Sequence, residues 1–168
     1  GYYNMDLTSP RTIRNIQEQF GFTFKKGLGQ NFLTARNILE EIVDAAEIES
    51  GVIEVGPGFG VLTSELAQNS DKVVTIEIDE RLIDVLDYTL AEYDNVKIIN
   101  EDILKLDLKK VIDDEFNGEK VSIAANLPYY ITTPIITKLL EEKLPIKNIV
   151  VMVQKEVAER MSAKPSTK

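Results

Sequence analysis

From Arg36 onward, short apolar runs alternate with longer segments in which apolar residues recur every three or four positions. Short runs rich in β-branched residues predict buried strands, and the three-to-four spacing predicts helices that bury one face. The predicted strands are VIEV (52–55), KVVTIEID (72–79), VKII (96–99), VSIAA (121–125) and NIVVMV (148–153). The predicted helices cover residues 36–48, 61–69, 80–93, 108–116, 133–142 and 154–163.

This order of elements predicts an α/β fold. Strands that alternate with helices form βαβ units, so we expect a Rossmann-like, mostly parallel and twisted sheet with helices on both faces. In such sheets, ligands bind beyond the carboxyl ends of the strands. The chemically unusual residues of this sequence all lie at the carboxyl ends of predicted strands: GPGFG (56–60), Glu77 with Asp79, Glu101 with Asp102, and NLPYY (126–130).

The composition of the chain limits which chemistry is available at the carboxyl ends of the strands. Its 168 residues suffice for about one domain, and 43% hydrophobic with 28% charged residues is typical of soluble globular proteins. Cysteine and histidine are absent, which excludes disulfides, thiolate ligands and the usual near-neutral base, so we expect no metal site. No apolar run approaches the ~20 residues that cross a bilayer, and no signal peptide is visible. We therefore expect a cytoplasmic protein without a membrane partner.

Charge is distributed unevenly along the chain. The net charge is −9, but residues 1–36 carry +3 and the remainder carries −12. A basic arm on an acidic body indicates a nucleic-acid contact, although ordinary solvated charges also explain so short a segment. The candidate phosphate contacts are Arg11, Arg14, Lys25 and Lys26.

The first candidate site is the turn after the first predicted strand, E-V-G-P-G-F-G at residues 54–60. Its glycines could serve a strand-to-helix turn alone. The dinucleotide fingerprint G-x-G-x-x-G does not fit, because Val61 stands where its third glycine would be. Gly56 and Gly58 instead favour a ligand that approaches the backbone closely but carries no pyrophosphate.

Acidic residues lie at the carboxyl ends of the next two strands. Glu77 comes 21 residues after Gly56, where a carboxylate can accept both hydroxyls of a ribose; an exposed strand-end acid is the alternative. Asp102 can accept from an adenine amino group between apolar walls made by Ile78 and Ile103, or it can merely cap a helix. Together with the glycine turn, these residues predict a cofactor that contains adenosine.

The segment NLPYY (126–130) adds a candidate catalytic site. The exocyclic nitrogen of adenine is a poor nucleophile, because its lone pair is delocalised into the ring. The side-chain oxygen of Asn126 and the backbone carbonyl of Leu127 can hold both of its hydrogens and favour a pyramidal nitrogen. Pro128 restricts that backbone, and Tyr129 offers a face on which a flipped-out base can stack. Attack on a sulfonium methyl can then rely on positioning and electrostatics.

Six segments, in order across residues 25–165, resemble the adenine N6,N6-dimethyltransferases of small-subunit (16S) ribosomal RNA. They are QNFL (30–33), EVGPGFGVLT (54–63), VTIEID (74–79), EDIL (101–104), NLPYYITTPI (126–135) and VQKEVAERM (153–161). The resemblance implies a methyltransferase fold, S-adenosyl-L-methionine as methyl donor, and two adjacent adenosines of small-subunit ribosomal RNA as acceptors during ribosome biogenesis. By matching positions it assigns cofactor contacts to Asn31, Leu33, Gly56, Glu77, Asp102 and Asn126, with Gln30 closing the methionine end.

The resemblance also implies how the chain is organised. Members of the family continue past AKP (163–165) into further strands and a helical domain that grips RNA. We therefore expect the N-terminal catalytic part of a longer protein that is monomeric at full length, and we expect this part alone to dimethylate RNA poorly. Its parts are GYYN (1–4), expected to be an expression remnant, a basic arm and cofactor-closing segment at 5–35, and the methyltransferase domain at 36–168.

Three other functions remain open from the sequence. The large-subunit ribosomal RNA adenine N6-methyltransferases of the macrolide-resistance type share the glycine turn and a similar N-x-P-Y. A nucleotide-dependent oxidoreductase is disfavoured by Val61 and NLPYY. A non-catalytic ribosome-assembly factor could keep the fold and act by binding, although an intact Asn126 and Tyr129 argue against lost catalysis.

Overall fold

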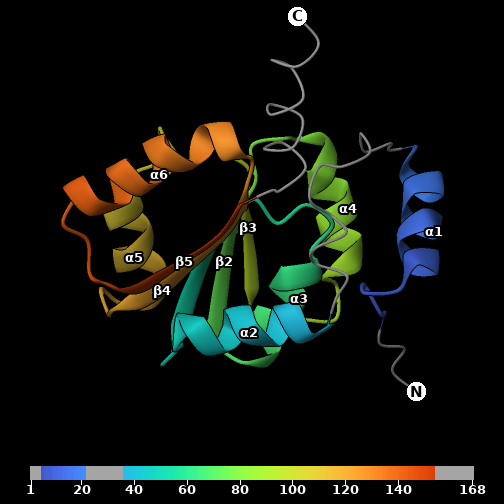
Figure 1. Ribbon diagram of the computed structural model, residues 1–168, viewed down its shortest axis with the longest axis horizontal. Helices are drawn as coiled ribbons and strands as arrows, with labels where there is room; N and C mark the ends of the chain where they lie inside the picture. The colour runs from blue at the N-terminus through green and yellow to red at the C-terminus, as the bar shows by residue number, and fades with distance from the viewer. Residues whose placement is uncertain (1–4, 22–35, 154–168) are drawn as a thin grey trace, which may run out of the picture.

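Five parallel strands form the sheet in a computed structural model that describes residues 5–21 and 36–153 (Figure 1). Their order across the sheet is β3-β2-β1-β4-β5. The strands are β1 (Gly51–Val55), β2 (Lys72–Ile76), β3 (Val96–Ile99), β4 (Val121–Leu127) and β5 (Ile146–Val153). The predicted parallel sheet of an α/β fold is confirmed.

Helices cover both faces of this sheet (Figure 1). Side chains alternate along a strand, so Val52 of β1 packs in one core and its neighbour Ile53 packs in the other. Leu62 and Leu86 lie in the first core, and Ile112 lies in the second. On the sheet, the helices of the first core are α2 (Arg36–Ala46), α3 (Val61–Gln68) and α4 (Arg81–Thr89), and those of the second are α5 (Leu108–Phe116) and α6 (Tyr129–Glu141). Ile16, from a further helix described below, also belongs to the first core.

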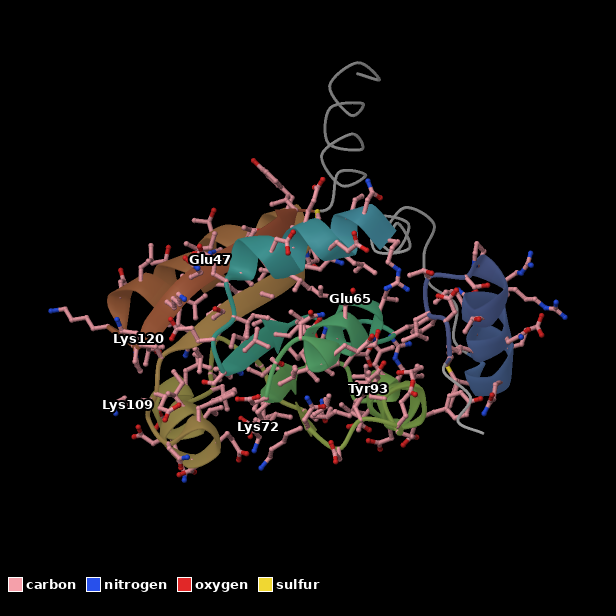
Figure 2. The ribbon with its side chains drawn as sticks, turned by 90° about the horizontal axis from the view of Figure 1, so that it is seen from below. Glu47, Glu65, Lys72, Tyr93, Lys109 and Lys120 are labelled. Carbon is pink, nitrogen blue, oxygen red and sulfur yellow. The ribbon has the colours of Figure 1, made fainter. Side chains whose placement is uncertain are left out.

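Burial on both faces explains the continuous apolar sequence of the central strands. Every residue of β1 is buried, including Glu54. Charged side chains such as Lys72 and Lys109 lie instead on the outside of the molecule (Figure 2).

One helix was not predicted: α1 (Pro10–Phe20) lies in the segment that the sequence presented only as a basic arm. Proline favours the first helical position, and Gly21 ends the helix in the left-handed region at φ 62°. Ile16 is buried, and Phe20 packs edge-to-face against Tyr88 of α4 with ring centroids 5.6 Å apart. Helix α1 therefore lies beside α4, outside the helical layer (Figure 1).

The start of α6 also differs from the prediction. We predicted a helix over residues 133–142. The structure extends β4 through Leu127 and begins α6 at Tyr129, with Pro128 as the N-cap. Pro134 lies inside the helix, whose burial of Ile135 and Leu139 outweighs the lost backbone hydrogen bond. The predicted loop is therefore a one-residue junction.

The strand order creates a crevice at one edge of the sheet. Strands β1, β2 and β3 follow one another in one direction, and β4 and β5 continue from β1 in the other. In open α/β sheets, such a reversal opens a crevice beyond the carboxyl ends of the two strands that flank it, here β1 and β4. Within residues 5–21 and 36–153, no helix has the length and apolar character needed to cross a membrane.

Candidate functional site

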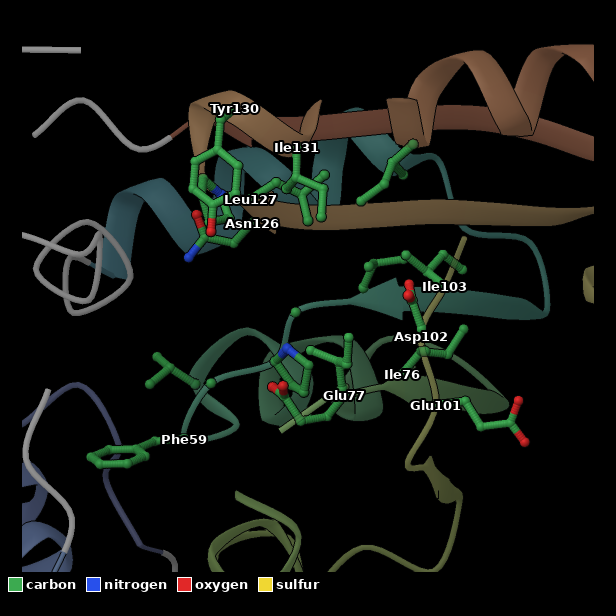
Figure 3. A pocket seen from close by; sticks show the side chains of 18 of the residues that line it. Phe59, Ile76, Glu77, Glu101, Asp102, Ile103, Asn126, Leu127, Tyr130 and Ile131 are labelled. Atoms are coloured by element: carbon green, nitrogen blue, oxygen red, sulfur yellow. The ribbon is translucent and has the colours of Figure 1, made fainter. Parts of the chain in front are cut away.

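A cavity of about 350 Å³ lies at this edge (Figure 3). Segments that follow β1, β2, β3 and β4 line it, together with the start of α6 and Ile13 of α1. Nine residues predicted for the site line this one cavity: Gly56, Gly58, Glu77, Ile78, Asp102, Ile103, Asn126, Leu127 and Pro128.

The glycine turn brings two strand ends together. Gly56 has φ +77°, and a Cβ there would lie 2.8 Å from the backbone oxygen of Asn126. Any side chain would push the turn away from the end of β4, so glycine is required on two counts. Gly58 has φ +57° but would meet nothing within 4 Å. Both glycines line the cavity.

Glu77 supplies a buried carboxyl group to this cavity. Only 6% of the residue is exposed, and its Oε2 accepts a hydrogen bond from the backbone N–H of Asp79 at 2.9 Å. Burial raises the pKa of the Glu77 carboxyl above its ordinary value, while hydrogen bonds from the backbone of Asp79, Gly58 and Ile78 oppose that rise. A buried acid held by backbone donors is oriented in advance for hydroxyl donors of a ligand.

A second acid, Glu54, is buried in β1 and is not among the residues that line the cavity. Its Oε1 accepts hydrogen bonds from the hydroxyl groups of Thr63 and Thr75, the latter at 2.8 Å. Burial raises the pKa of Glu54 to about 7, and the charge of Glu77 adds to that rise. Its Oε2 is buried without a hydrogen-bond partner in the described part of the chain.

The end of β3 forms another wall of the cavity. Asp102 Oδ1 accepts from the backbone N–H of Leu104 at 2.9 Å, so this side chain stabilises a turn as well as lining the cavity. Ile103 is buried, whereas Ile78 is 65% exposed. An exposed isoleucine on a cavity wall is an apolar surface available to a ligand.

Asn126 is the unsatisfied group of the site. Its side chain lies at the cavity near the end of β4 (Figure 3). The Oδ1 atom is buried and has no hydrogen-bond partner among residues 5–21 and 36–153. An unpaired buried acceptor costs about 1–3 kcal/mol, so it calls for a donor from outside the described structure.

The two tyrosines of NLPYY differ in position. Tyr129, which we predicted as a stacking face, is 51% exposed and is not among the cavity-lining residues of the described structure. Tyr130 is 73% exposed and lines the cavity, as does Asn126 (Figure 3). Tyr130 was missed because nothing in the sequence separates it from its neighbour.

The remaining predicted residues lie elsewhere. Arg11 and Arg14 are exposed on α1. Gln30, Asn31, Leu33, Lys25 and Lys26 fall outside the described residues, as does the predicted helix at 154–163. Among the described residues no group of acidic, histidine or cysteine side chains could hold a metal ion.

Other lining residues were not predicted, because apolar side chains carry no sign of a site in the sequence. Ile13, Phe59 and Ile131 are three of them. The signal for Ile13 was its spacing with Ile16 and Phe20, which is that of a helix face.

Comparison with known proteins decides the family. The family model of ribosomal RNA adenine dimethylase matches residues 21–168. The chain belongs to this family. Ribosomal RNA small subunit methyltransferase A of Bacillus mycoides (strain KBAB4) is 57% identical over 166 residues, which cover 97% of this chain. They cover 57% of that relative, so the chain spans little more than half its length.

Solved structures agree with this membership. The 23S rRNA methyltransferase ErmE is 31% identical, with a TM-score of 0.64, over 80% of this chain and 52% of that one. A dimethyladenosine transferase from Plasmodium falciparum is 36% identical, with a TM-score of 0.59, over 76% of this chain and 45% of that one. The Rossmann-like methyltransferase fold predicted from the sequence is thereby confirmed.

Proposed function

We propose that this chain is the cofactor-binding part of an enzyme that dimethylates N6 of two adjacent adenosines in small-subunit ribosomal RNA, with S-adenosyl-L-methionine as donor. The observation that carries the proposal is the buried, unpaired Oδ1 of Asn126 beside the cavity that Glu77 also lines. Identity of 57% to a small-subunit enzyme, against 31% to the large-subunit enzyme ErmE, favours the small subunit. Such an enzyme would act in the cytoplasm, where ribosomal subunits mature.

The residues present fit this cofactor. The Glu77 carboxylate would accept the ribose hydroxyls, and Ile78 with Ile103 would enclose the adenine. Asp102 would accept from the adenine amino group, and the open space at Gly58 leaves room for the ligand to approach the backbone. When bound, the cofactor supplies an electrophilic sulfonium methyl group.

Asn126 would then orient the acceptor. Its Oδ1 and the carbonyl of Leu127 would each accept one hydrogen of the target amine, which directs the nitrogen lone pair toward the methyl. In a buried site, such preorganised acceptors are worth more than in water. The unpaired state of Asn126 is the expected state of a group whose partner is the substrate.

An aromatic side chain beside Asn126 would hold the flipped base. Stacking on an aromatic ring typically contributes about 1–3 kcal/mol per base. In the full-length enzyme, Tyr129→Ala should lose rate and base docking, while Tyr129→Phe should keep most of both. A Tyr129→Phe enzyme as inactive as Tyr129→Ala would show that the hydroxyl matters instead. A Tyr130→Ala enzyme that alone lost docking would assign the stacking to Tyr130.

RNA contacts would begin at α1. Arg11 and Arg14 are exposed there, whereas residues 37–168 carry most of the acidic charge. Neutralisation of phosphates by a few such residues gives weak, salt-dependent binding, so the rest of the full-length enzyme would supply most of the RNA affinity.

Two measurements test this function. In calorimetric titration the 168-residue chain should bind S-adenosyl-L-methionine and should not bind NAD; the reverse would overturn the proposal. In a methyl-incorporation assay on undermethylated small ribosomal subunits, the full-length enzyme should dimethylate adenosine, and this chain at equal concentration should do so poorly. Comparable dimethylation by the two would show that the further region is not needed.

A further inference from the structure

Two asparagines flank β3 and make the same kind of contact at its opposite ends. Beyond the carboxyl end, the side-chain amide of Asn100 donates to the backbone oxygens of Glu77 at 2.8 Å and Ile78 at 3.3 Å. Just before the amino end, the side-chain amide of Asn95 donates to the backbone oxygens of Ala67 at 2.9 Å and Ser70 at 3.0 Å. Each amide therefore holds two backbone carbonyls of a neighbouring segment: those of successive residues for Asn100, and those of residues three apart for Asn95.

The segment held by Asn100 carries ligand-facing side chains. Register pairing of β2 with β3 ends at Ile76 and Ile99, and the backbone N–H of Glu77 makes one further bond to Ile99 at 2.9 Å. Past that bond the Asn100 side chain continues the connection between the two strand ends. Glu77 and Ile78, whose carbonyls it holds, both line the cavity.

We propose that Asn100 is a positioning residue for the adenosine end of the cofactor site, acting through the backbone of Glu77 and Ile78; this rests on the proposed function. A carboxylate that accepts two ribose hydroxyls must be held within a fraction of an ångström, and supporting hydrogen bonds supply that constraint. Ile78 benefits from the same support, because the residue is 65% exposed and burial constrains it little.

The two asparagines should differ in what their removal costs. Asn100 is exposed, so its replacement removes no core contact, and water can hydrate the two freed carbonyls. The loss should therefore fall on the geometry of the site. Asn95 binds the last turn of α3 and the residues that follow it, far from the cavity, so its loss should fall on stability.

The test compares Asn100→Ala with Asn95→Ala in the 168-residue chain, by calorimetric titration with S-adenosylhomocysteine and by thermal unfolding without ligand. Asn100→Ala should weaken binding about tenfold, the equivalent of one to two lost hydrogen bonds, with little change in the unfolding midpoint. Asn95→Ala should lower the midpoint and leave affinity within about twofold. Equal affinity in the parent and Asn100→Ala would overturn the inference.

Two further variants separate positioning from a general structural role. Asn100→Asp keeps the shape of the side chain but replaces its donors with a carboxylate beside two carbonyls. This variant should bind S-adenosylhomocysteine less tightly than Asn100→Ala does. Asn95→Asp adds the same charge at the opposite end of β3 and serves as its control. In a Glu77→Ala background, Asn100→Ala should cost at most about threefold, because the main group it positions is gone. A full additive loss there would contradict action through Glu77.

The proposed function can fail separately. A parent chain that binds no S-adenosylhomocysteine would overturn the proposed function and this inference with it. A parent that binds while Asn100→Ala binds equally well would overturn the inference alone.

Discussion

The polar groups at the two ends of the parallel sheet differ in what they face. At the amino ends, Lys72 of β2 and Lys97 of β3 both bind the carboxylate of Glu115, at 2.7 and 2.8 Å. The hydroxyl of Ser122 in β4 donates to the backbone oxygen of Ala46 at 2.6 Å. These polar groups are thus paired within the protein.

At the carboxyl ends, the polar groups face a cavity instead. The side-chain oxygen of Asn126 is buried without a partner in the described part of the chain, and burial raises the pKa of Glu77. Ile78 and Tyr130 expose apolar surface there. Paired groups stabilise the fold, whereas unpaired buried groups cost stability unless a ligand satisfies them. The difference indicates that one end holds the sheet together and the other is arranged for a ligand.

The largest expected difference between the two ends is in the rate of methyl transfer after loss of a side-chain amide. In the full-length enzyme, Asn126→Ala should reduce methyl transfer by about 100- to 1,000-fold, as loss of one preorganised hydrogen-bonding group in an active site does. Cofactor affinity and RNA affinity should change far less. Single-turnover methyl transfer and RNA binding measure the two effects.

The matched control is Asn148→Ala at the amino ends. The side-chain amide of Asn148 donates to Glu47 Oε2 at 2.7 Å and to the backbone oxygen of Ala46 at 3.3 Å. Its loss should lower the unfolding midpoint and leave the rate of methyl transfer unchanged. If Asn148→Ala lost as much rate as Asn126→Ala, the two ends would not differ as described.

A smaller difference between the two ends is expected in cofactor affinity after loss of an acidic side chain. Glu77→Ala should weaken binding of S-adenosylhomocysteine by about 1–3 kcal/mol, because the ribose hydroxyls lose a charged acceptor. Glu115→Ala should leave that affinity unchanged and cost stability, because Lys72 and Lys97 lose their shared partner. Calorimetry of both variants measures the affinity, and thermal unfolding measures the stability. Parent-like affinity in Glu77→Ala would refute the ribose assignment.

Much of this site follows from the sequence, because its polar residues sit where predicted strands end. Gly56, Glu77, Asp102 and Asn126 needed only the alternation of strands and helices to be brought to one edge. A residue at the carboxyl end of a predicted strand can be placed in the fold from the sequence alone, since the carboxyl ends of parallel strands all lie at the same edge of the sheet.

What the sequence did not predict depends on packing between distant segments. Helix α1 is stabilised by contacts such as Phe20 with Tyr88, which no local pattern contains. The continuation of α6 through Pro134 depends on burial of Ile135 against the sheet. Asn100 became visible only through the two carbonyls that it holds.

The smallest expected effect is a pair of opposite pH dependences of stability. Glu54 has its pKa raised by burial to about 7, so the folded state keeps a proton that the unfolded state releases above about pH 4.5. Its contribution to stability should therefore fall as pH rises from about 4.5 to 7. At the amino ends, Lys72 and Lys97 hold the pKa of Glu115 below its usual value, so its contribution should be lost as pH falls.

Urea unfolding across this pH range measures both dependences. Glu54→Gln should remove the decline toward pH 7, and Glu115→Gln should flatten the decline on the acid side. A parent chain whose stability rises steadily from pH 5 to pH 7, with Glu54→Gln following the same curve, would show that Glu54 does not hold its proton.

A crystal structure of the 168-residue chain with S-adenosylhomocysteine tests the central claim most directly, namely that the cavity at the carboxyl ends of the strands is the cofactor site. The account predicts the ligand in the cavity of about 350 Å³, with its ribose hydroxyls on the Glu77 carboxylate and its sulfur facing Asn126. The pairs at the amino ends should be unchanged. A ligand bound elsewhere, or bound in this cavity with Glu77 turned away from the ribose, would contradict the account.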